Sequence, residues 1–396
     1  MGNVAPTLTL STAEAAQWNR DLLLRFHVAL EIDPAADLLS MFPDAYHHEH
    51  QIAQYRQLSY AAKVNLQTLN RLRDTLKGPP DFRTRLELAE TATIVFPLSA
   101  KVTALLARDS ERTLNGGLCD TEKSLLVSLK RLFWNSPKLW SDPVRGVVVR
   151  CDEEIVAKVN MGNKDHTEYT SMRYLAEQAP TIPAPRPHGL NAFGPFRVLF
   201  MSYIPGRTLT QAWPSMSHND KSSIQCQLDS IFCRLRTLQQ NDGIALGGVC
   251  GEGVKELRVD ECSLFKGITT AMEFNDLQFS TNPHGSATYV KLLHFFLEQN
   301  SSALTHGSVF THGDVRTDNI MVKQDNISGC YAVTGIIDWE DSGFYPEYYE
   351  CTALIRTLSL LDEDDCYLYL PQSISPSQFP GRWLVDQLWG IHLRTT

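Results

Sequence analysis

Hydrophobic positions divide the chain into a mainly helical first part and a mixed second part. A serine at position 11 stands three residues before a glutamate, which is the spacing of a helix capping box, and an apolar-rich run continues to Leu30. Residues 46–76 also have a helical pattern, which ends at a Gly-Pro-Pro stretch that cannot continue a helix. We therefore predict a helical N-terminal region over residues 1–135, in which no chemistry indicates a role.

The pattern changes near residue 140, where short β-branched runs replace the helical period. The runs VRGVVVRC and EEIVAKVN are separated by Asp152 and Glu153, which is typical of a hairpin. A helix is predicted over HTEYTSMRYLAEQ, an extended segment over the proline-rich TIPAPRP, and a strand over FRVLFMSYI. Residues 140–205 therefore predict a small sheet with one helix.

Helices dominate again after residue 206. One buried helical face is indicated by apolar residues at steps of four, three, four and three, namely Ile224, Leu228, Ile231, Leu235 and Leu238. TYVKLLHFFLEQ predicts another helix, and YAVTGIIDWE predicts a strand. Residues 206–396 are thus expected to form a larger, mostly helical lobe.

Composition places the chain among ordinary soluble proteins, since 43% of its residues are hydrophobic and 20% are charged. The net charge of −9 argues against a nucleic-acid partner, because nucleic-acid binders usually carry a basic excess. The same charge is compatible with a cationic or neutral small molecule. The most apolar stretch, TATIVFPLSAKVTALLA, is interrupted by Pro97 and Lys101 and is too short to span a bilayer, so no membrane partner is expected.

The cysteines and the first residues bear on localisation. Nine cysteines are scattered without a CxxC pair, which is typical of reduced thiols and predicts a cytoplasmic protein. The opening MGNVAPTLTL lacks the basic and apolar regions of a signal peptide, and Pro6 stands where a myristoylation motif needs Ser or Thr.

Candidate chemistry gathers in VFTHGDVRTDNIMV, residues 309–322. Asp314 and Asn319 are five residues apart, and Asp338 follows nineteen residues later at the end of an apolar strand, within the segment 336–341. Phosphoryl transfer from ATP needs a carboxylate at the attacking hydroxyl and oxygen ligands for magnesium. An Asp-x4-Asn loop followed by a strand-terminal Asp can supply both.

The small sheet offers further candidates for the same chemistry. Lys158 ends the strand run IVAK, and Glu168 follows ten residues later at the start of the predicted helix, where it could pair with the lysine. A strand lysine, a helix glutamate, an Asp-x4-Asn loop and a metal-binding Asp, in this chain order, follow the plan of a two-lobed kinase. The predicted fold class is therefore α+β, a two-lobed protein-kinase-like fold with a helical N-terminal extension.

In these segments the chain resembles the aminoglycoside phosphotransferase and choline kinase-like family. The resemblance covers about residues 140–396 and is carried by THGDVRTDNIMV, GIIDWEDSGFYPEYYE, IPAPRP and MSYIPGRTL. GIIDWEDSGFYPEYYE and the tail DEDDCYLYLPQSI are most similar to fungal members. The resemblance implies ATP and Mg²⁺ as cofactors and transfer of the γ-phosphoryl group to a hydroxyl of a small molecule.

The resemblance also implies roles for the catalytic loop, residues 312–319, and the metal-binding Asp. Asp314 would orient the acceptor hydroxyl and accept its proton. Arg316 would steady the transferring phosphoryl group or anchor the loop. Asn319 and Asp338 would hold magnesium.

Five residues of the smaller lobe are implied in nucleotide binding. Lys158 would contact the α- and β-phosphates, with Glu168 as its partner. The backbones of Ser202 and Ile204 would face the adenine, and Met201 would line its pocket. Backbone groups supply the hydrogen bonds to the adenine, so side-chain identity constrains these positions little.

Two alternatives stay open. The hairpin turn at Cys151, Asp152 and Glu153 has no glycine-rich loop and adds negative charge near the phosphates, which favours a pseudokinase acting as a binding protein. A protein kinase would need a long activation segment after the metal-binding Asp. Here Ser-Gly-Phe-Tyr-Pro follows Asp338 within a few residues, so this alternative is less favoured.

The identity of the acceptor is open at this point. Acidic residues that could face a cationic acceptor are Glu340, Asp341, Glu347 and Glu350, and the run Asp362 to Asp365 could rim the same pocket. A charge run is more often a solvated surface.

Overall fold

The computed structural model describes residues 14–34, 36, 38, 41, 81–110, 121–162, 165–280, 287–299, 307–356, 358 and 365–395. Two compact units divide the chain, Met1–Thr84 and Arg85–Thr396. In the first unit α1 spans Glu14–Ile32, which confirms the helix predicted after position 11. The helix predicted over residues 46–76 lies outside the described residues.

A six-stranded sheet forms the smaller lobe of the second unit, in the order β1-β5-β6-β4-β3-β2, and every neighbouring pair is antiparallel. Its strands are β1 (Ala92–Phe96), β2 (Lys138–Asp142), β3 (Gly146–Arg150), β4 (Ile155–Met161), β5 (Pro187–Phe193) and β6 (Phe196–Ser202). The inner strands β4 and β6 are buried along most of their length, as their continuous apolar sequences require.

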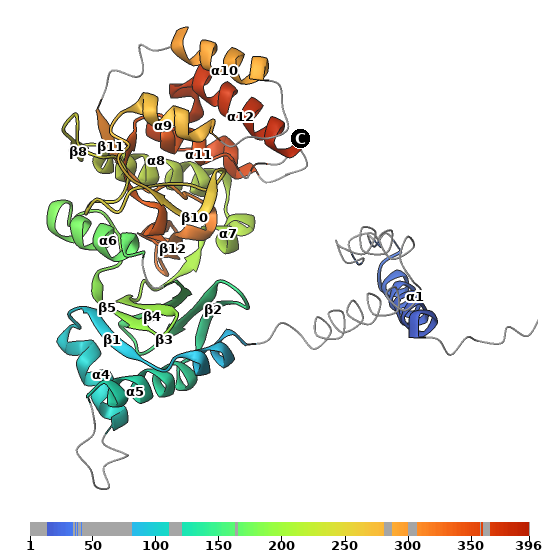
Figure 1. The fold of residues 1–396 in the computed structure, drawn as a ribbon, viewed down its shortest axis with the longest axis vertical. Helices are drawn as coiled ribbons and strands as arrows, with labels where there is room; N and C mark the ends of the chain where they lie inside the picture. The colour runs from blue at the N-terminus through green and yellow to red at the C-terminus, as the bar shows by residue number, and fades with distance from the viewer. Residues whose placement is uncertain are drawn as a thin grey trace, which may run out of the picture. The chain divides into compact units, whose positions relative to one another are not determined.

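Helices contact this sheet on both sides. They are α4 (Ala100–Ser110), α5 (Thr121–Asn135) and α6 (Thr167–Gln178), preceded by the 3-10 helix η2 (Phe82–Leu88). Figure 1 shows α4 and α5 on the side that faces away from the larger lobe and α6 between the sheet and that lobe. The predicted sheet with one helix is therefore present, with more helices around it than the sequence indicated.

The structure places the start of this lobe earlier than the predicted residue 140. β1 lies within the region predicted as helical, yet it pairs with β5, with Ala92 opposite Phe193. A short apolar run cannot be assigned to helix or strand from its periodicity alone, and the partner strand lies about a hundred residues later. The described residues between 85 and 135 thus belong with the sheet, and the separate N-terminal unit is shorter than 1–135.

The larger lobe is mostly helical, as predicted. Its helices are α7 (Leu209–Ala212), α8 (His218–Leu235), α9 (Ala271–Gln278), α10 (Ala287–Gln299), α11 (Tyr349–Ala353) and α12 (Pro380–Thr395). Its 3-10 helices are η4 (Trp213–Ser215), η6 (Thr317–Asn319), η7 (Trp339–Asp341), η8 (Asp365–Tyr369), η9 (Gln372–Ile374) and η10 (Pro376–Gln378).

Three small sheets complete this lobe. Their strands are β7 (Arg207–Thr208), β8 (Gln239–Gln240), β9 (Val254–Glu256), β10 (Asp260–Phe265), β11 (Ser308–Thr311), β12 (Ile320–Gln324), β13 (Tyr331–Ile336) and β14 (Gly343–Pro346). They pair as β14-β11-β8, β13-β12-β7 and β10-β9. The loop between β11 and β12 and the turn after β13 carry the predicted catalytic and metal-binding residues.

Helix α8 is the central support of this lobe. Four of the five predicted positions, from Ile224 to Leu235, are buried, and Leu238 lies just beyond the end of the helix. The helix starts at a capping box in which the Ser217 hydroxyl accepts a hydrogen bond from the Asp220 N–H at 3.2 Å. Within the described residues, no helix is both long and apolar enough to cross a membrane.

Candidate active site

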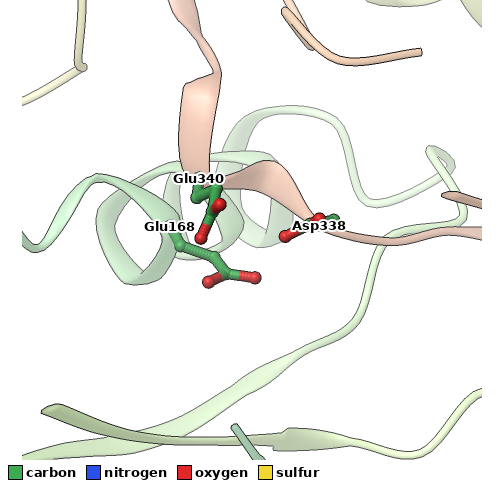
Figure 2. Close-up of side chains that lie close together, drawn as sticks. All are labelled: Glu168, Asp338 and Glu340. Carbon is green, nitrogen blue, oxygen red and sulfur yellow. The ribbon is translucent and has the colours of Figure 1, made fainter. Parts of the chain in front are cut away.

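Lys158 lies in the middle of β4 and is only 8% exposed. Its ammonium contacts three carboxylates, namely Glu168 at 2.9 Å, Asp338 at 2.5 Å and Glu340 at 3.1 Å. Figure 2 shows these carboxylates converging from α6 and from the segment that enters η7. The predicted pair of Lys158 and Glu168 is therefore formed, and Asp338 joins it from a position 180 residues away in the chain.

The charge balance of this cluster governs its protonation. Burial alone would lower the pKa of Lys158, but the charges of Glu168, Asp338 and Glu340 raise it well above its ordinary value. Burial raises the pKa of Glu168, and the Lys158 charge only partly offsets this rise. Burial alone would also raise the pKa of Asp338, but the charge and hydrogen bond of Lys158 keep this pKa below its ordinary value. The charge of Lys158 thus favours the ionised form of the Asp338 carboxylate.

Glu340 was considered as an acceptor-site residue, but it belongs to the lysine cluster. Its Oε2 also accepts hydrogen bonds from Asn160 Nδ2 at 3.3 Å and Arg197 Nη2 at 3.4 Å. Arg197 in turn pairs with Asp165 at 3.1 Å, and Lys255 pairs with the same Asp165 at 2.7 Å. The sequence offered only a weak signal for this network, namely single charges next to apolar runs.

Asp338 has an unusual backbone conformation. Its φ is +69°, and it is the one non-glycine residue with a positive φ among the described residues. Such a conformation is strained for most side chains and is tolerated best by Asp and Asn. This conformation ends the extended backbone that follows β13 and turns the Asp338 carboxylate toward Lys158. β14 begins at Gly343, so the chain returns to a sheet almost at once and leaves no room for a long activation segment.

The catalytic loop is held from below by Glu350 of α11. The buried Glu350 carboxylate accepts hydrogen bonds from the backbone N–H of His312 at 2.6 Å and of Gly313 at 3.1 Å. His312 Nε2 lies 3.0 Å from the Ile337 carbonyl and donates to it, so its Nδ1 accepts the Asp314 N–H at 3.2 Å. Glu350 therefore positions the loop and does not face an acceptor, contrary to the sequence interpretation.

The three predicted residues of the catalytic loop meet at one oxygen. Asp314 Oδ2 accepts hydrogen bonds from Arg316 Nη2 at 2.5 Å and Nε at 3.0 Å, and from Asn319 Nδ2 at 2.9 Å. The same Nδ2 also donates to the Asp314 carbonyl at 2.8 Å. Because the amide nitrogen of Asn319 faces Asp314, its amide oxygen points away from that carboxylate.

The predicted adenine segment joins the two lobes. Met201 is 7% exposed at the end of β6. The Ser202 N–H donates to the Arg186 carbonyl at 2.9 Å, and its hydroxyl accepts the Arg186 N–H at 2.8 Å. Ile204 packs directly on β13, since a Cβ at Gly335 would lie 2.3 Å from its Cδ1. Ser202 is thus tied to the proline-rich segment, and Ile204 contacts the larger lobe.

Four backbone N–H groups of the hairpin turn between β3 and β4 form hydrogen bonds within the turn. Asp152 Oδ1 accepts the N–H groups of Glu154 and Ile155, each at 2.7 Å. The N–H groups of Cys151 and Asp152 donate to the Ile155 carbonyl at 2.9 and 3.3 Å. These amides already have partners, so the turn does not present the open backbone donors of a phosphate-binding loop.

The other acidic candidates are also paired within the protein. Asp341 lies 3.5 Å from Lys255, and Glu347 lies 3.4 Å from Arg236. Asp365 accepts Lys221 Nζ at 2.8 Å and Trp213 Nε1 at 2.7 Å. The rest of the acidic run, residues 362–364, lies outside the described residues.

The solved structures that match this chain include aminoglycoside phosphotransferases. The ternary complex of APH(2″)-IIa with streptomycin and ATP has a TM-score of 0.45 at 14% identity and covers 70% of this chain and 98% of its own. A thermostable mutant of aminoglycoside phosphotransferase APH(4)-Ia with ADP and hygromycin B has a TM-score of 0.44 at 14% identity, covering 65% and 84%. Aminoglycoside phosphotransferase APH(3″)-Id from Streptomyces rimosus has a TM-score of 0.39 at 16% identity, covering 68% and 97%.

Among curated protein sequences, none matches this chain. The model of the phosphotransferase enzyme family matches residues 165–368, just over half of the chain. The matched segment runs from the start of α6 to η8 and includes the catalytic loop and the metal-binding segment. The chain therefore belongs to the phosphotransferase enzyme family and has its two-lobed, protein-kinase-like fold.

Proposed function

We propose that the protein is an ATP- and magnesium-dependent kinase that transfers the γ-phosphoryl group to a hydroxyl of a small molecule in the cytoplasm. The observation that carries this proposal is the convergence of Lys158, Glu168 and Asp338, together with an Asp314 bonded to Asn319. In the family these are the groups that hold phosphates, hold the metal and align the hydroxyl. The similarity to fungal members stays a prediction.

The donor atoms suit a hard divalent cation. Carboxylate oxygens of Glu168, Asp338 and Glu340 lie within 4.8 Å of one another, and magnesium prefers one or two carboxylates plus phosphate oxygens and water. We assign Asp338 and the Asn319 amide oxygen as metal ligands. Bound magnesium would neutralise negative charge on the phosphate oxygens.

Lys158 must change partners when a nucleotide binds. In the structure its ammonium is shared among three carboxylates, of which Asp338 is also the proposed metal ligand. Contact with the α- and β-phosphates requires Lys158 to leave Asp338 and Glu340, while Glu168 keeps it aimed from the helix. Met201 would line the adenine pocket, and the backbones of Ser202 and Ile204 would face the adenine edge.

Asp314 and Arg316 would act on the reacting groups. In the structure Arg316 covers Asp314 Oδ2 with two hydrogen bonds. We infer that Arg316 turns away from Oδ2 when the acceptor hydroxyl donates to the Asp314 carboxylate. The released guanidinium can then bind the oxygens of the transferring phosphoryl group, and Asp314 holds the proton that the hydroxyl loses.

The metal-dependent part of the proposal is tested by thermal unfolding with ATP and magnesium. A ligand that binds only the folded state stabilises it by about 2.7 kcal/mol at a hundredfold excess over its Kd. We expect a magnesium-dependent rise in melting temperature for the wild type and for Asp276→Asn, an exposed carboxylate of α9. Asp338→Asn should lose that rise. No magnesium-dependent rise in the wild type at millimolar ATP would refute the proposal.

The second candidate function is an inactive pseudokinase that serves as a binding protein. The hairpin turn around Asp152 favours this candidate. Its backbone N–H groups at Glu154 and Ile155, which could otherwise hold phosphates, donate to the Asp152 carboxylate. Nucleotide binding without turnover of ATP on any hydroxyl compound would support this candidate. Phosphorylation of any acceptor that requires Asp314 would eliminate it.

A further inference from the structure

A cavity of about 270 Å³ lies beside the catalytic loop, between α7, α8 and the segment that contains η8 and η9. Arg316, Thr317 and Asp318 of the loop form one of its edges. The Thr210 hydroxyl of α7 is bonded to the Thr317 hydroxyl at 2.7 Å, which fastens the helix to the loop. The volume is close to the lower limit of roughly 300 Å³ for small-molecule pockets, so a compact ligand fits.

The most deeply buried residues that line the cavity are apolar. They include Leu209, Ile224, Leu228 and Ile320, each of which is at most 4% exposed. The charged lining residues, Arg316 and Asp318, are exposed at the surface. A ligand that enters therefore exchanges water for hydrocarbon along most of its body and meets charge only beside the catalytic loop.

Two aromatic rings that line the cavity have hydrogen-bonded polar atoms. Trp213 Nε1 donates to Asp365 at 2.7 Å, and the Tyr369 hydroxyl is bonded to His218 Nδ1 at 2.7 Å. The two rings lie edge to face, with their centroids 5.6 Å apart. A wall whose polar atoms are already bonded offers flat, apolar surface to a ligand.

The described lining of the cavity holds few carboxylates for a polycation. Asp318 is the only acidic residue among those that line it within the described part of the chain. The neighbouring Asp365 is neutralised by Lys221, with both carboxylate oxygens 2.8 Å from the ammonium. A buried ammonium group without a carboxylate partner costs several kcal/mol, so the described lining suits an uncharged ligand better than an amino sugar with several such groups.

We propose that this cavity is the acceptor site, and that the acceptor is a compact, uncharged molecule with an aromatic or alicyclic body and a free hydroxyl. The proposal rests on the kinase function proposed above and specifies its substrate class. The hydroxyl points past Arg316 to Asp314, and its oxygen bonds to the γ-phosphorus of ATP. The bond from that phosphorus to the bridging oxygen breaks, ADP leaves with the electron pair, and the hydroxyl proton passes to Asp314.

Umbelliferone, a fluorescent fused-ring phenol, is a suitable probe, and its fluorescence anisotropy reports binding without nucleotide. We expect wild-type protein to bind it, and Cys366→Trp, which fills the cavity, to weaken binding by about tenfold or more. The matched control is Cys330→Trp, at an exposed cysteine in the turn between β12 and β13, which should bind like the wild type. Absence of binding at millimolar concentration, or equal binding by both variants, would overturn the proposal.

A second pair of variants provides an independent test in case Cys366→Trp does not fold. Leu370→Trp also fills the cavity, and its control is Leu384→Trp, on a side chain of α12 that is 52% exposed. Each variant's thermal unfolding without ligand is recorded first. Neomycin, a polycation, should bind wild-type protein more weakly than umbelliferone in calorimetry. Stronger neomycin binding that both filling variants abolish would overturn the assigned substrate class.

Failure of this inference is distinguishable from failure of the kinase function. Asp338→Asn should bind umbelliferone like the wild type, because the cavity does not include that residue. A magnesium-ATP shift without umbelliferone binding would overturn the acceptor assignment and leave the kinase function intact. Umbelliferone binding without any magnesium-ATP shift would refute the kinase function and with it the role of the cavity as an acceptor site.

Discussion

Individual side chains at this site carry more than one role. In the structure Lys158 contacts three carboxylates, and Arg316 covers Asp314 Oδ2. In the proposed reaction phosphates would replace two of the partners of Lys158, and an acceptor hydroxyl would replace Arg316 at Asp314. This exchange of partners avoids leaving a buried carboxylate unpaired, which would be costly.

Asp314→Asn tests the general base directly. The amide cannot accept the hydroxyl proton, although it can keep the hydrogen-bonding shape of the loop. Since general-base catalysis contributes about a hundredfold or more to the rate, we expect kcat to fall by about that factor on any acceptor that the wild type phosphorylates. The magnesium-ATP thermal shift should be retained. Unchanged turnover in Asp314→Asn would show that another group takes the proton.

Short elements, and not long ones, position the reacting residues. The loop of residues 312–319 ends in η6, and Asp338 stands just before η7. Glu350 of α11 binds the backbone of that loop. The turn of His312 and Gly313 has no regular secondary structure of its own. Its geometry therefore depends on the Glu350 carboxylate, which accepts two backbone N–H groups in a buried place.

Glu350→Gln should damage both stability and turnover. The amide turns a donor toward a backbone N–H that needs an acceptor, so one buried donor loses its partner. We expect the free energy of unfolding in urea to fall by about 1–3 kcal/mol and kcat to fall with it. Glu347→Gln is the matched control, because Glu347 pairs with Arg236 nearer the surface. A Glu350→Gln protein as stable and active as that control would contradict the positioning role.

The two lobes are joined by both apolar and charged contacts. One hydrophobic cluster contains Val156 and Leu199 of the sheet as well as Ile224 and Phe310 of the larger lobe. At the cleft side, the lysine cluster and the chain from Arg197 through Asp165 to Lys255 bridge the same lobes. Farther from the cleft, the buried Asp386 fixes α12 through Arg356 at 2.9 Å and Arg258 at 3.0 Å. The second unit thus depends on several ionised carboxylates.

This dependence predicts a loss of stability in acid. Burial acts upward on the pKa of Asp386, but the charges of Arg356 and Arg258 outweigh it and hold the pKa below its ordinary value. The charges of Lys255 and Arg197 lower the pKa of Asp165 in the same way. A carboxylate with a lowered folded-state pKa stabilises the protein above its unfolded pKa of about 3.9 and loses this contribution as pH falls through the folded value.

Urea unfolding between neutral pH and pH of about 3 measures this effect. We expect stability to fall below pH of about 4, and Asp386→Asn to be less stable at neutral pH but to lose less on acidification. Glu168 and Glu350 act in the opposite direction, because their raised folded-state pKa values make stability fall as pH rises above about 4.3, their unfolded value. An acid loss in Asp386→Asn as steep as in the wild type would exclude Asp386 as a source.

The amino-acid sequence determined the features that depend on local order and spacing. The apolar stripe of α8, the strand that carries Lys158, the Asp-x4-Asn loop and the chain order of the site residues could all be predicted, because each is set by neighbours in the chain. The pairing of Lys158 with Glu168 could be predicted from chain order, because α6 follows the strand of Lys158 after a short connection, although Lys158 lies in the middle of that strand.

The tertiary structure alone decided which distant groups meet. It placed β1 beside β5, Glu340 at Lys158, Glu350 under the catalytic loop and Asp365 against Lys221. In the sequence these acidic residues are indistinguishable from ligands of a cationic acceptor, because a carboxylate carries no local sign of its partner. Their partners come from elements up to 182 residues away, and only packing of the two lobes brings such charges within hydrogen-bonding distance.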